Sequence, residues 1–410
     1  MASVEVVEPG PREVGAAVGI ALAVVAATRL PFARGGPVET DELLFVAQMS
    51  EGWFPIHHTL FQMAGRAIGM LGGGNYRGLV VLDMIVSALA LAGVWWWLRA
   101  LVRPGTAAAA SMMLAASPVF WSLGEMAGNY TMIPLVGSFL LGVAYRGWGE
   151  PRGWHPYASA VVLAAGTGYR EDIGMFWLPV LGVILWQHRW RPALGALAVF
   201  TALNLAWLLP MLHGVGGLEE YRLRSADFAR SAGYGNSVWN LGMVDAPLRY
   251  AVKMGLAIAW TLGPGLAFVP RGLARLGSIR HGRWLGALMA LAAAPALASH
   301  LLIHFGVAGY SFHYLPAMIA LLAVGIGRVS APDGSDDRAP ARLSAMAAAL
   351  ACVFLIYPAR TDRPGLRGDF DLAVARYTRV GLHSVVADRF PGTWRTANSV
   401  TGRSPGPVGP

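Results

Sequence analysis

Charge and cysteine are both scarce in this chain. Only 13% of its 410 residues are charged, whereas 55% are hydrophobic. A soluble globular domain carries roughly 25% charged residues. Because the deficit extends along the sequence, it excludes an ordinary soluble protein and indicates a polytopic membrane protein. Cys352 is the only cysteine, which excludes an intrachain disulfide and a cysteine metal cluster.

Lysine is also rare, so the net charge of +9 comes almost wholly from arginine. A basic balance of this size is compatible with nucleic-acid binding. Here, however, the arginines lie in short stretches between apolar runs, where membrane topology explains them better. We therefore expect the lipid bilayer, and no nucleic acid, among the partners. Tandem repeats, a GxGxxG pattern and a P-loop are absent from the sequence as well.

Apolar runs, by contrast, are abundant. A membrane span needs about 20 apolar residues, and the clear candidates are residues 13–30, 78–98, 105–121, 128–145, 192–211, 247–269, 285–304, 312–328 and 342–358. The first of these runs has no small-x-small cleavage site after it, so we expect a retained span and not a removed signal peptide. Residues 156–187 hold two further apolar runs, each shorter than a usual span.

The arginines decide how residues 156–187 cross the membrane. Arg146 and Arg152 precede this region, and Arg189 and Arg191 follow it. Both flanks are therefore expected on the cytoplasmic side, and returning to the same side requires two crossings. The sequence thus predicts an all-α polytopic membrane protein with about 11 transmembrane helices over residues 1–358.

The same arginine distribution predicts the sides of the loops. The N-terminus is expected in the cytoplasm and the protein in the cell (plasma) membrane. Residues 31–77, the long loop 212–246 and a tail over residues 359–410 are expected outside. The short loops 121–127 and 305–311 carry no arginine and are expected there too. An active site formed by these loops would be extracytoplasmic.

The first outer loop contains the densest polar chemistry. Asp41 and Glu42 follow Thr40, which suits a helix N-cap, and carboxylates in a first helical turn are favoured by the helix dipole. Capping explains the two acids as well as chemistry does. The functional interpretation is a general base or metal ligand just outside the bilayer. Nearby stand His57 and His58, although adjacent histidines in a loop are more often solvated than ligating.

Other charged residues lie close to predicted spans. Glu125, in a short outer loop, is a functional-site candidate, although simple exposure would also explain it. Arg170 and Asp172 fall between two short helices, so they should be recessed below the outer surface, where charges must pair or face water. An internal ion pair is one interpretation. The other is that Arg170 binds a phosphate, to which its planar fork is suited.

Two more segments complete the candidate set. Arg222 and Arg224 lie in the long loop among aromatic residues, a composition that suits an anionic, sugar-bearing ligand and equally suits a solvated amphipathic helix. Tyr310 and His313 lie at the outer ends of two spans, in the segment HFGVAGYSFHYLPA. Aromatic residues there are normally anchors at the membrane interface. Histidines beside them are less ordinary.

These pieces, in this order, resemble the GT-C superfamily of polyprenyl-phosphate-sugar-dependent glycosyltransferases over residues 14–330. The resemblance is closest to the protein-mannosyltransferase-like and dolichyl-phosphate-mannose-mannosyltransferase-like families. In these families an acidic residue or pair follows the first span, as Asp41–Glu42 does here, and Glu125 corresponds to a second acid. The segments GYREDIGMFWLP and HFGVAGYSFHYLP match further family-like patterns. The family's His-Pro-Pro segment is replaced by WFPIHHTLF, with His57 as its counterpart, which leaves the acceptor open.

The resemblance implies a GT-C-like helical bundle with a catalytic first outer loop. It implies inverting transfer of a sugar, mannose-like or other, from a polyprenyl-phosphate donor to a hydroxyl of a glycan, glycolipid or protein. The catalytic candidates are Asp41, Glu42 and Glu125. The candidates for binding the donor phosphate and substrate are Arg170, Asp172, His57, His58, Arg222, Arg224, Tyr310 and His313. A divalent metal at Asp41, Glu125 and His57 is compatible with the residues, but their spacing does not demand one.

Two other function classes fit a polytopic membrane protein. A lipid or glycolipid transporter or flippase would line a pathway with recessed charges such as Arg170 and Asp172. Paired interrupted helices in two halves would then be expected, and the sequence does not show them. A scaffold without catalysis would use the acids only to cap helices.

Overall fold

Helices make up the described part of the protein. The computed structural model describes residues 8–30, 40–51, 55–72, 74–148, 150–231, 246–306, 308–327 and 338–356. No strand occurs in these ranges, so the all-α fold class predicted from the sequence is confirmed. The predicted tail over residues 359–410, and residues 232–245 of the predicted long loop, lie outside the described ranges.

A helix covers each segment predicted to be a span. In the first half these are α1 (Pro11–Arg29), α4 (Gly74–Leu98), α5 (Pro104–Ala115), α6 (Pro118–Leu123), α7 (Met132–Gly147), α8 (His155–Tyr169), α9 (Glu171–Trp186) and α10 (Trp190–Val215). In the second half they are α13 (Ala246–Leu262), η3 (Gly263–Phe268), α15 (Gly282–Leu302), α16 (Leu315–Ile326) and α17 (Ala339–Ile356). Between them lie the connecting helices α14 (Val269–Arg275), η4 (Leu276–Ser278) and η5 (Ala308–His313).

Several of these segments can cross a bilayer by length and composition alone. Five helical segments qualify in the described ranges, namely α1, α4, α10, Pro247–Ser278 and α15. Both α1 and α10 expose apolar side chains, among them Ile20, Leu22, Leu194 and Leu197. Exposed apolar faces on long helices suit contact with lipid. The chain is therefore an integral membrane protein, while the total of about 11 spans stays a prediction.

The interruptions in the helices have local causes. Residues 105–121, predicted as a span, form two helices, α5 and α6, and whether they cross the membrane together stays a prediction. Pro118 lacks a backbone N–H and begins the second helix, and the Ser117 hydroxyl accepts a hydrogen bond from the Phe120 N–H at 3.5 Å. The predicted break in residues 156–187 is confirmed. Arg170 there has an extended backbone, which ends α8 and starts α9.

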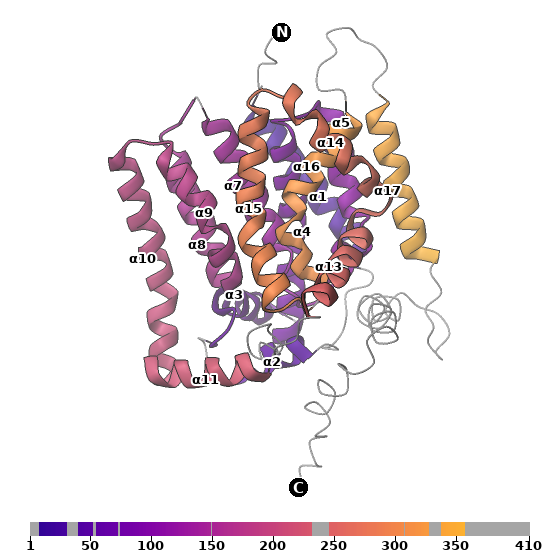
Figure 1. The fold of residues 1–410 in the computed structure, drawn as a ribbon. Helices are drawn as coiled ribbons and strands as arrows, with labels where there is room; N and C mark the ends of the chain where they lie inside the picture. Colours follow the sequence, from indigo (N-terminus) through magenta and orange to yellow (C-terminus); the bar gives the residue numbers. More distant parts are fainter. Residues whose placement is uncertain are drawn as a thin grey trace.

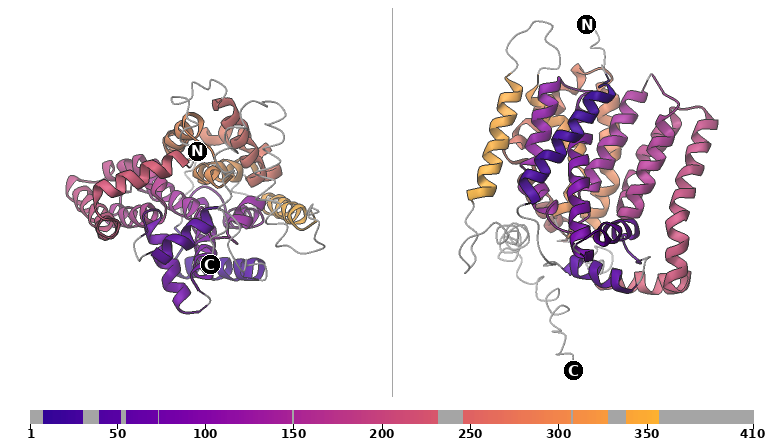
Figure 2. Two further views of the ribbon diagram at one scale, coloured as in Figure 1. Left: turned by 90° about the horizontal axis from the view of Figure 1, so that it is seen from below. Right: turned by 180° about the vertical axis from the view of Figure 1, so that it is seen from behind.

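The long helices stand side by side, and three short helices lie at one end of this bundle (Figures 1 and 2). The three are α2 (Thr40–Glu51), α3 (Thr59–Met70) and α11 (Leu218–Ser231). We call this end, at the bottom of Figure 1, the α3 end. α10 occupies one edge of the bundle and α17 the opposite edge. All three short helices come from loops predicted to lie outside, so these loops share one end of the molecule.

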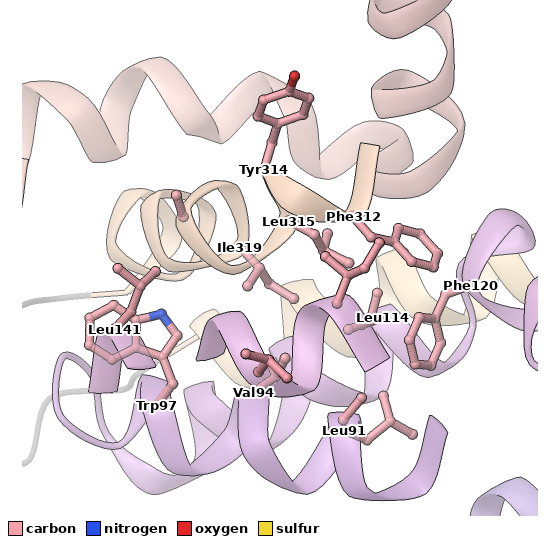
Figure 3. Close-up of a cluster of buried hydrophobic side chains, with 14 of the residues drawn as sticks. Leu91, Val94, Trp97, Leu114, Phe120, Leu141, Phe312, Tyr314, Leu315 and Ile319 are labelled. Carbon is pink, nitrogen blue, oxygen red and sulfur yellow. The ribbon is translucent and has the colours of Figure 1, made fainter. Parts of the chain in front are cut away.

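α4 is the central element of the hydrophobic core. Its inner side chains meet residues of α5, α6, α7, η5 and α16 (Figure 3). The cluster includes Leu91, Val94, Trp97, Leu114, Phe120, Leu141, Phe312, Leu315 and Ile319. The Trp97 indole N–H donates to the Pro316 carbonyl at 3.0 Å, which satisfies its buried polar atom. Because α4 is packed at the centre of the core, the polar side chains at the α3 end that contact α4 are held in a fixed position.

Glycines bring α3 directly onto the start of α4. A Cβ added at Gly78 would lie 1.9 Å from the Gly65 carbonyl oxygen and 2.6 Å from the Gly69 nitrogen. Real Cβ atoms do not approach backbone this closely, so the contact requires glycine. The position of α3, and of the histidine pair immediately before it, is therefore set by backbone-to-backbone packing on α4.

Candidate active site

Arg170 is the best-anchored cation of the α3 end. Its side chain is only 6% exposed, and its Nε lies 2.9 Å from the Asp172 carboxylate. Nη1 donates to the Asn129 side-chain oxygen at 2.7 Å. The guanidinium carbon lies 4.0 Å from the Tyr130 ring centroid and 5.1 Å from that of Tyr310. Two acceptors and two aromatic rings therefore fix the orientation of the guanidinium plane.

His313 extends this cluster from η5. Its Nε2 lies 3.6 Å from Asp172 Oδ2, and the Trp177 indole N–H donates to its Nδ1 at 3.3 Å. Because an indole nitrogen only donates, Nδ1 must accept, and the ring proton belongs on Nε2, facing the carboxylate. Four of the predicted site residues, Arg170, Asp172, Tyr310 and His313, therefore lie in one cluster.

Glu42 joins α2 to the segment that contains Glu125. The Glu42 side chain is fully buried, and its Oε1 accepts hydrogen bonds from the Tyr76 hydroxyl and the Ala127 N–H, both at 3.0 Å. Glu125 is also fully buried and accepts a hydrogen bond from the Trp121 indole. Neither acid is therefore a solvent-exposed cap or loop tip. Asp41 begins the same helix, next to Glu42, but its side chain lies outside the described atoms.

The histidine pair is held against α9. His58 Nδ1 lies 2.7 Å from Glu171 Oε2, and the His58 backbone N–H donates to Glu171 Oε1 at 2.6 Å. Gln62 donates to the His57 carbonyl at 2.6 Å. Burial lowers the pKa of His57 to about 4, although the Glu171 carboxylate opposes this shift. His57 is therefore neutral at pH 7 and can serve as a hydrogen-bonding group but not as a fixed cation.

Arg222 and Arg224 stand apart from this cluster. Arg222 lies 3.7 Å from Glu219, and Arg224 lies 2.7 Å from Glu220 on the same helix, α11. All four side chains are well exposed, and the contacts of Arg170 do not include them. The described contacts thus favour the solvated amphipathic helix that the sequence left open for this segment.

Asp83, Asn129 and Tyr130 were not foreseen as site residues. Asp83 is fully buried in α4, where its Oδ1 accepts hydrogen bonds from the Thr131 hydroxyl and, at 3.4 Å, from the Tyr169 hydroxyl. The sequence did contain a signal for Asp83, because an ionisable residue inside an apolar span marks a functional site by default. Asn129 and Tyr130 stand in a short loop with no pattern that distinguishes them.

Asp41, Glu125 and His57 are the residues that could hold a divalent metal according to the sequence. Among the described side chains, no group of three or more histidine, cysteine, aspartate or glutamate residues is arranged to hold an ion. The Asp41 side chain is not part of that set. A metal at these three residues therefore stays a prediction.

Comparisons with known proteins agree with the arrangement of these elements. Residues 58–213 match the family model described as dolichyl-phosphate-mannose-protein mannosyltransferase. Among solved structures, the chain is similar to the crystal structure of ArnT from Cupriavidus metallidurans bound to undecaprenyl phosphate. That match has a TM-score of 0.59 at 15% sequence identity and covers 96% of this chain and 74% of that chain. No curated protein matches the sequence significantly.

The two comparisons differ in how much of the chain they cover. The family model includes His58, Glu125, Arg170 and Asp172. The structural match extends over nearly the whole chain, and at this level of identity it shows a shared fold. The resemblance to the GT-C superfamily of membrane glycosyltransferases, and within it to the protein-mannosyltransferase-like families, is therefore confirmed.

Proposed function

We propose that this protein transfers a sugar from a polyprenyl-phosphate donor to an acceptor hydroxyl, with inversion at the anomeric carbon. The reaction takes place at the α3 end of the bundle, which we assign to the extracytoplasmic face of the plasma membrane. The acceptor is a glycan, a glycolipid or a protein. ArnT, whose fold this chain shares, was crystallised with undecaprenyl phosphate, which supports a donor of this lipid class.

The observation that carries the proposal is the way in which neighbouring side chains hold the Arg170 guanidinium. Its Nε and Nη1 are bound to Asp172 and Asn129, whereas Nη2 has no hydrogen-bond partner among the described residues. A planar guanidinium held in this way can present its remaining N–H groups to a phosphate without reorganising. His313 and Tyr310 border the same cation and suit the remainder of the donor head group.

Asp41 is the residue that we assign as general base. It follows the first span, as the catalytic acid does in the families that the chain resembles. The contact between Glu42 and the Ala127 N–H joins the start of α2 to the segment between Glu125 and Asn129. In the proposed step, Asp41 removes the proton of the acceptor hydroxyl, whose oxygen attacks the anomeric carbon. The bond to the phosphate oxygen breaks, and the phosphate leaves as an anion beside Arg170. Positioned cations and donors lower the barrier to such a step.

The first test replaces the proposed base. Asp41→Asn keeps the shape of the side chain but removes its ability to accept the proton, so we expect transfer to fall by about 10²–10⁴-fold. The measurement is sugar transfer by membranes supplied with labelled polyprenyl-phosphate mannose, arabinose or glucose. Glu219→Gln, an amide substitution at an exposed acid of α11, is the matched control and should retain full activity.

Measurements of sugar transfer, lipid movement and donor binding separate the alternatives. Full activity of Asp41→Asn, at normal levels of inserted protein, would contradict the assignment of the base. A wild-type protein that moves the labelled lipid between leaflets of a vesicle without releasing its sugar would be a flippase and would overturn the proposed function. Binding of the donor to purified protein, with no sugar transfer to any offered glycan, glycolipid or protein acceptor, would favour a scaffold.

A further inference from the structure

Asp83 is a buried carboxyl group to which the proposed reaction gives no role. It lies nine residues after the start of α4, which places it about 13 Å along the helix from that end. Its side chain is fully buried among the helices of the core. An ionisable residue at such a depth in a membrane protein is costly, so its presence requires a compensating function.

The contacts of Asp83 are concentrated on one oxygen atom. Oδ1 accepts hydrogen bonds from the Thr131 and Tyr169 hydroxyl groups. Oδ2 is buried without a close hydrogen bond in the described part of the chain, and the carboxylate also interacts with the Arg29 cation and the Gly128 backbone. Asp83 is thus surrounded by polar groups from α1, from the segment of residues 128–131 and from α8, and it connects these three elements.

Its two partners lie next to the residues that orient Arg170. Thr131 follows Asn129 by two positions, and Tyr169 immediately precedes Arg170. Asn129 accepts the hydrogen bond from Arg170 Nη1. One oxygen of Asp83 therefore joins the two chain segments that carry the two ends of the Arg170–Asn129 hydrogen bond.

Both of these segments lie outside the interior of a helix. Asn129 has a backbone φ of 51°, in the left-handed region, and Arg170 has an extended backbone between two helices. The Arg170 N–H donates to the Gly166 carbonyl at 2.8 Å and its carbonyl accepts from the Ile173 N–H at 3.1 Å, so its backbone is held only by bonds at the ends of α8 and α9. Asp83, projecting from the long and well-packed α4, is a rigid point against which both segments can be fixed.

We propose that Asp83 is a positioning residue that holds Arg170 and Asn129 in the geometry needed to bind the donor phosphate. This inference rests on the proposed function, because it assumes that Arg170 binds the phosphate. Asp83 does not touch the donor in this proposal. It acts through Thr131 and Tyr169, so its loss should weaken donor binding while leaving the general base and the acceptor site intact.

The test compares donor and acceptor kinetics. Asp83→Asn preserves the size of the side chain, but a neutral amide oxygen accepts the Thr131 and Tyr169 hydrogen bonds more weakly than a charged carboxylate does. We expect the donor KM to rise about tenfold, with kcat and the acceptor KM changing less than about twofold. Thr131→Val and Tyr169→Phe each remove one contact and should give a smaller rise of the same kind.

The control is Ser87→Ala. Ser87 lies one helical turn after Asp83 on α4 and is equally buried, so its substitution perturbs the same core without touching Thr131 or Tyr169. Its donor KM should stay at the wild-type value. Thermal unfolding in detergent, measured for every variant, reports general damage to the fold separately.

The outcomes distinguish this inference from the proposed function. If Arg170→Lys raises the donor KM but Asp83→Asn, Thr131→Val and Tyr169→Phe do not, the positioning role is wrong and the function stands. If wild-type protein binds no polyprenyl-phosphate sugar, the proposed function itself fails. If the Asp83→Asn protein does not accumulate in membranes, the donor KM of the Thr131→Val and Tyr169→Phe variants tests the positioning role instead. An unchanged donor KM in both variants would contradict it.

Discussion

Two neighbouring acids, Asp41 and Glu42, look equivalent in the sequence, and the contacts of Glu42 give it a structural role. Glu42 accepts two hydrogen bonds, one of them from the backbone of the Glu125 segment. An acid that is occupied in this way is suited to joining α2 to that segment. We therefore reassign Glu42 from the set of catalytic candidates to a structural link, and Asp41 remains the proposed base.

The residue-scale electrostatics of His57 lead to a prediction for pH dependence. Burial keeps the pKa of His57 near 4 in the folded protein, whereas an unfolded chain has a histidine pKa of about 6.5. Between these values the unfolded state binds more protons, so stability falls as the pH is lowered through this window. Of its charged neighbours, the Glu171 carboxylate raises the pKa of His57 and the His58 ring lowers it. The unfolding temperature of the purified protein should therefore drop between pH 7 and pH 5.

The His57→Gln variant isolates this contribution. Glutamine keeps a polar side chain but does not titrate, so the drop in unfolding temperature should be smaller than in the wild type. Other buried histidines would still contribute equally in both proteins. An identical pH profile for the two proteins would show that His57 is not held in its neutral form.

At the scale of elements, the contact between α3 and α4 leaves no room for a side chain at Gly78. Gly78→Ala would place a methyl group against the backbone of Gly65 and Gly69. Forcing extra volume into such a contact typically costs about 1–3 kcal/mol. We expect a lower unfolding temperature, and also weaker activity, because a displaced α3 moves His58 away from Glu171.

A matched glycine is available on α1. A Cβ added at Gly19 would meet no atom within 4 Å, so Gly19→Ala should leave stability unchanged or raise it by up to about 1 kcal/mol through helix propensity. Thermal unfolding of both variants in detergent makes the comparison. Equal stability of the two variants would mean that α3 is not fixed by the Gly78 contact.

The order and position of the helices could largely be predicted because apolar runs and arginine placement act over many residues at once. The break at Arg170 followed from the shortness of two runs and the parity of their flanks. The break at Ser117–Pro118 was missed because the surrounding residues are apolar enough to continue a span. Local hydrogen bonding, not hydropathy, decided that position.

The candidate site was predictable only in part, for a related reason. Arg170, Asp172, Tyr310 and His313 stood out as polar or aromatic residues at span ends, and they do lie together. Arg222 and Arg224 had the same local signature, yet their ion pairs stay on α11. Which charges converge depends on contacts between segments far apart in sequence, and a single sequence does not contain that information.

At the scale of the whole molecule, the orientation that we propose in the membrane rests on the arginine distribution and can be tested. Glu150 and Glu219 are both exposed, and they stand in loops that we assign to opposite sides. In a Cys352→Ser background, Glu219→Cys should react with a membrane-impermeant thiol reagent in intact cells. Glu150→Cys should react only after the membrane is opened.

The reversed labelling pattern would place the α3 end in the cytoplasm and would contradict an extracytoplasmic active site. Reaction of both cysteines in intact cells would show that the two loops share one side, which would change the number of crossings between them. The Cys352→Ser protein without an introduced cysteine is the control and should remain unlabelled in each condition.

The burial of Arg29 and Asp83 also constrains how the chain enters the bilayer during synthesis. Arg29 ends α1 and contacts the aromatic rings of Phe120 and Trp121, beside Gly124 and Ser87. α4 has an ionisable residue inside the membrane at Asp83, and a single helix of this kind is disfavoured by about 2.5–3.5 kcal/mol when it leaves the translocon alone. α1 and α4 pack against each other, so the insertion machinery would have to retain α1 until α4 has been made. α1 and α4 would then enter the lipid together, although the whole first loop separates them in the sequence. Substitutions in that loop that prevent α1 and α4 from packing would therefore reduce membrane insertion, whatever their effect on catalysis.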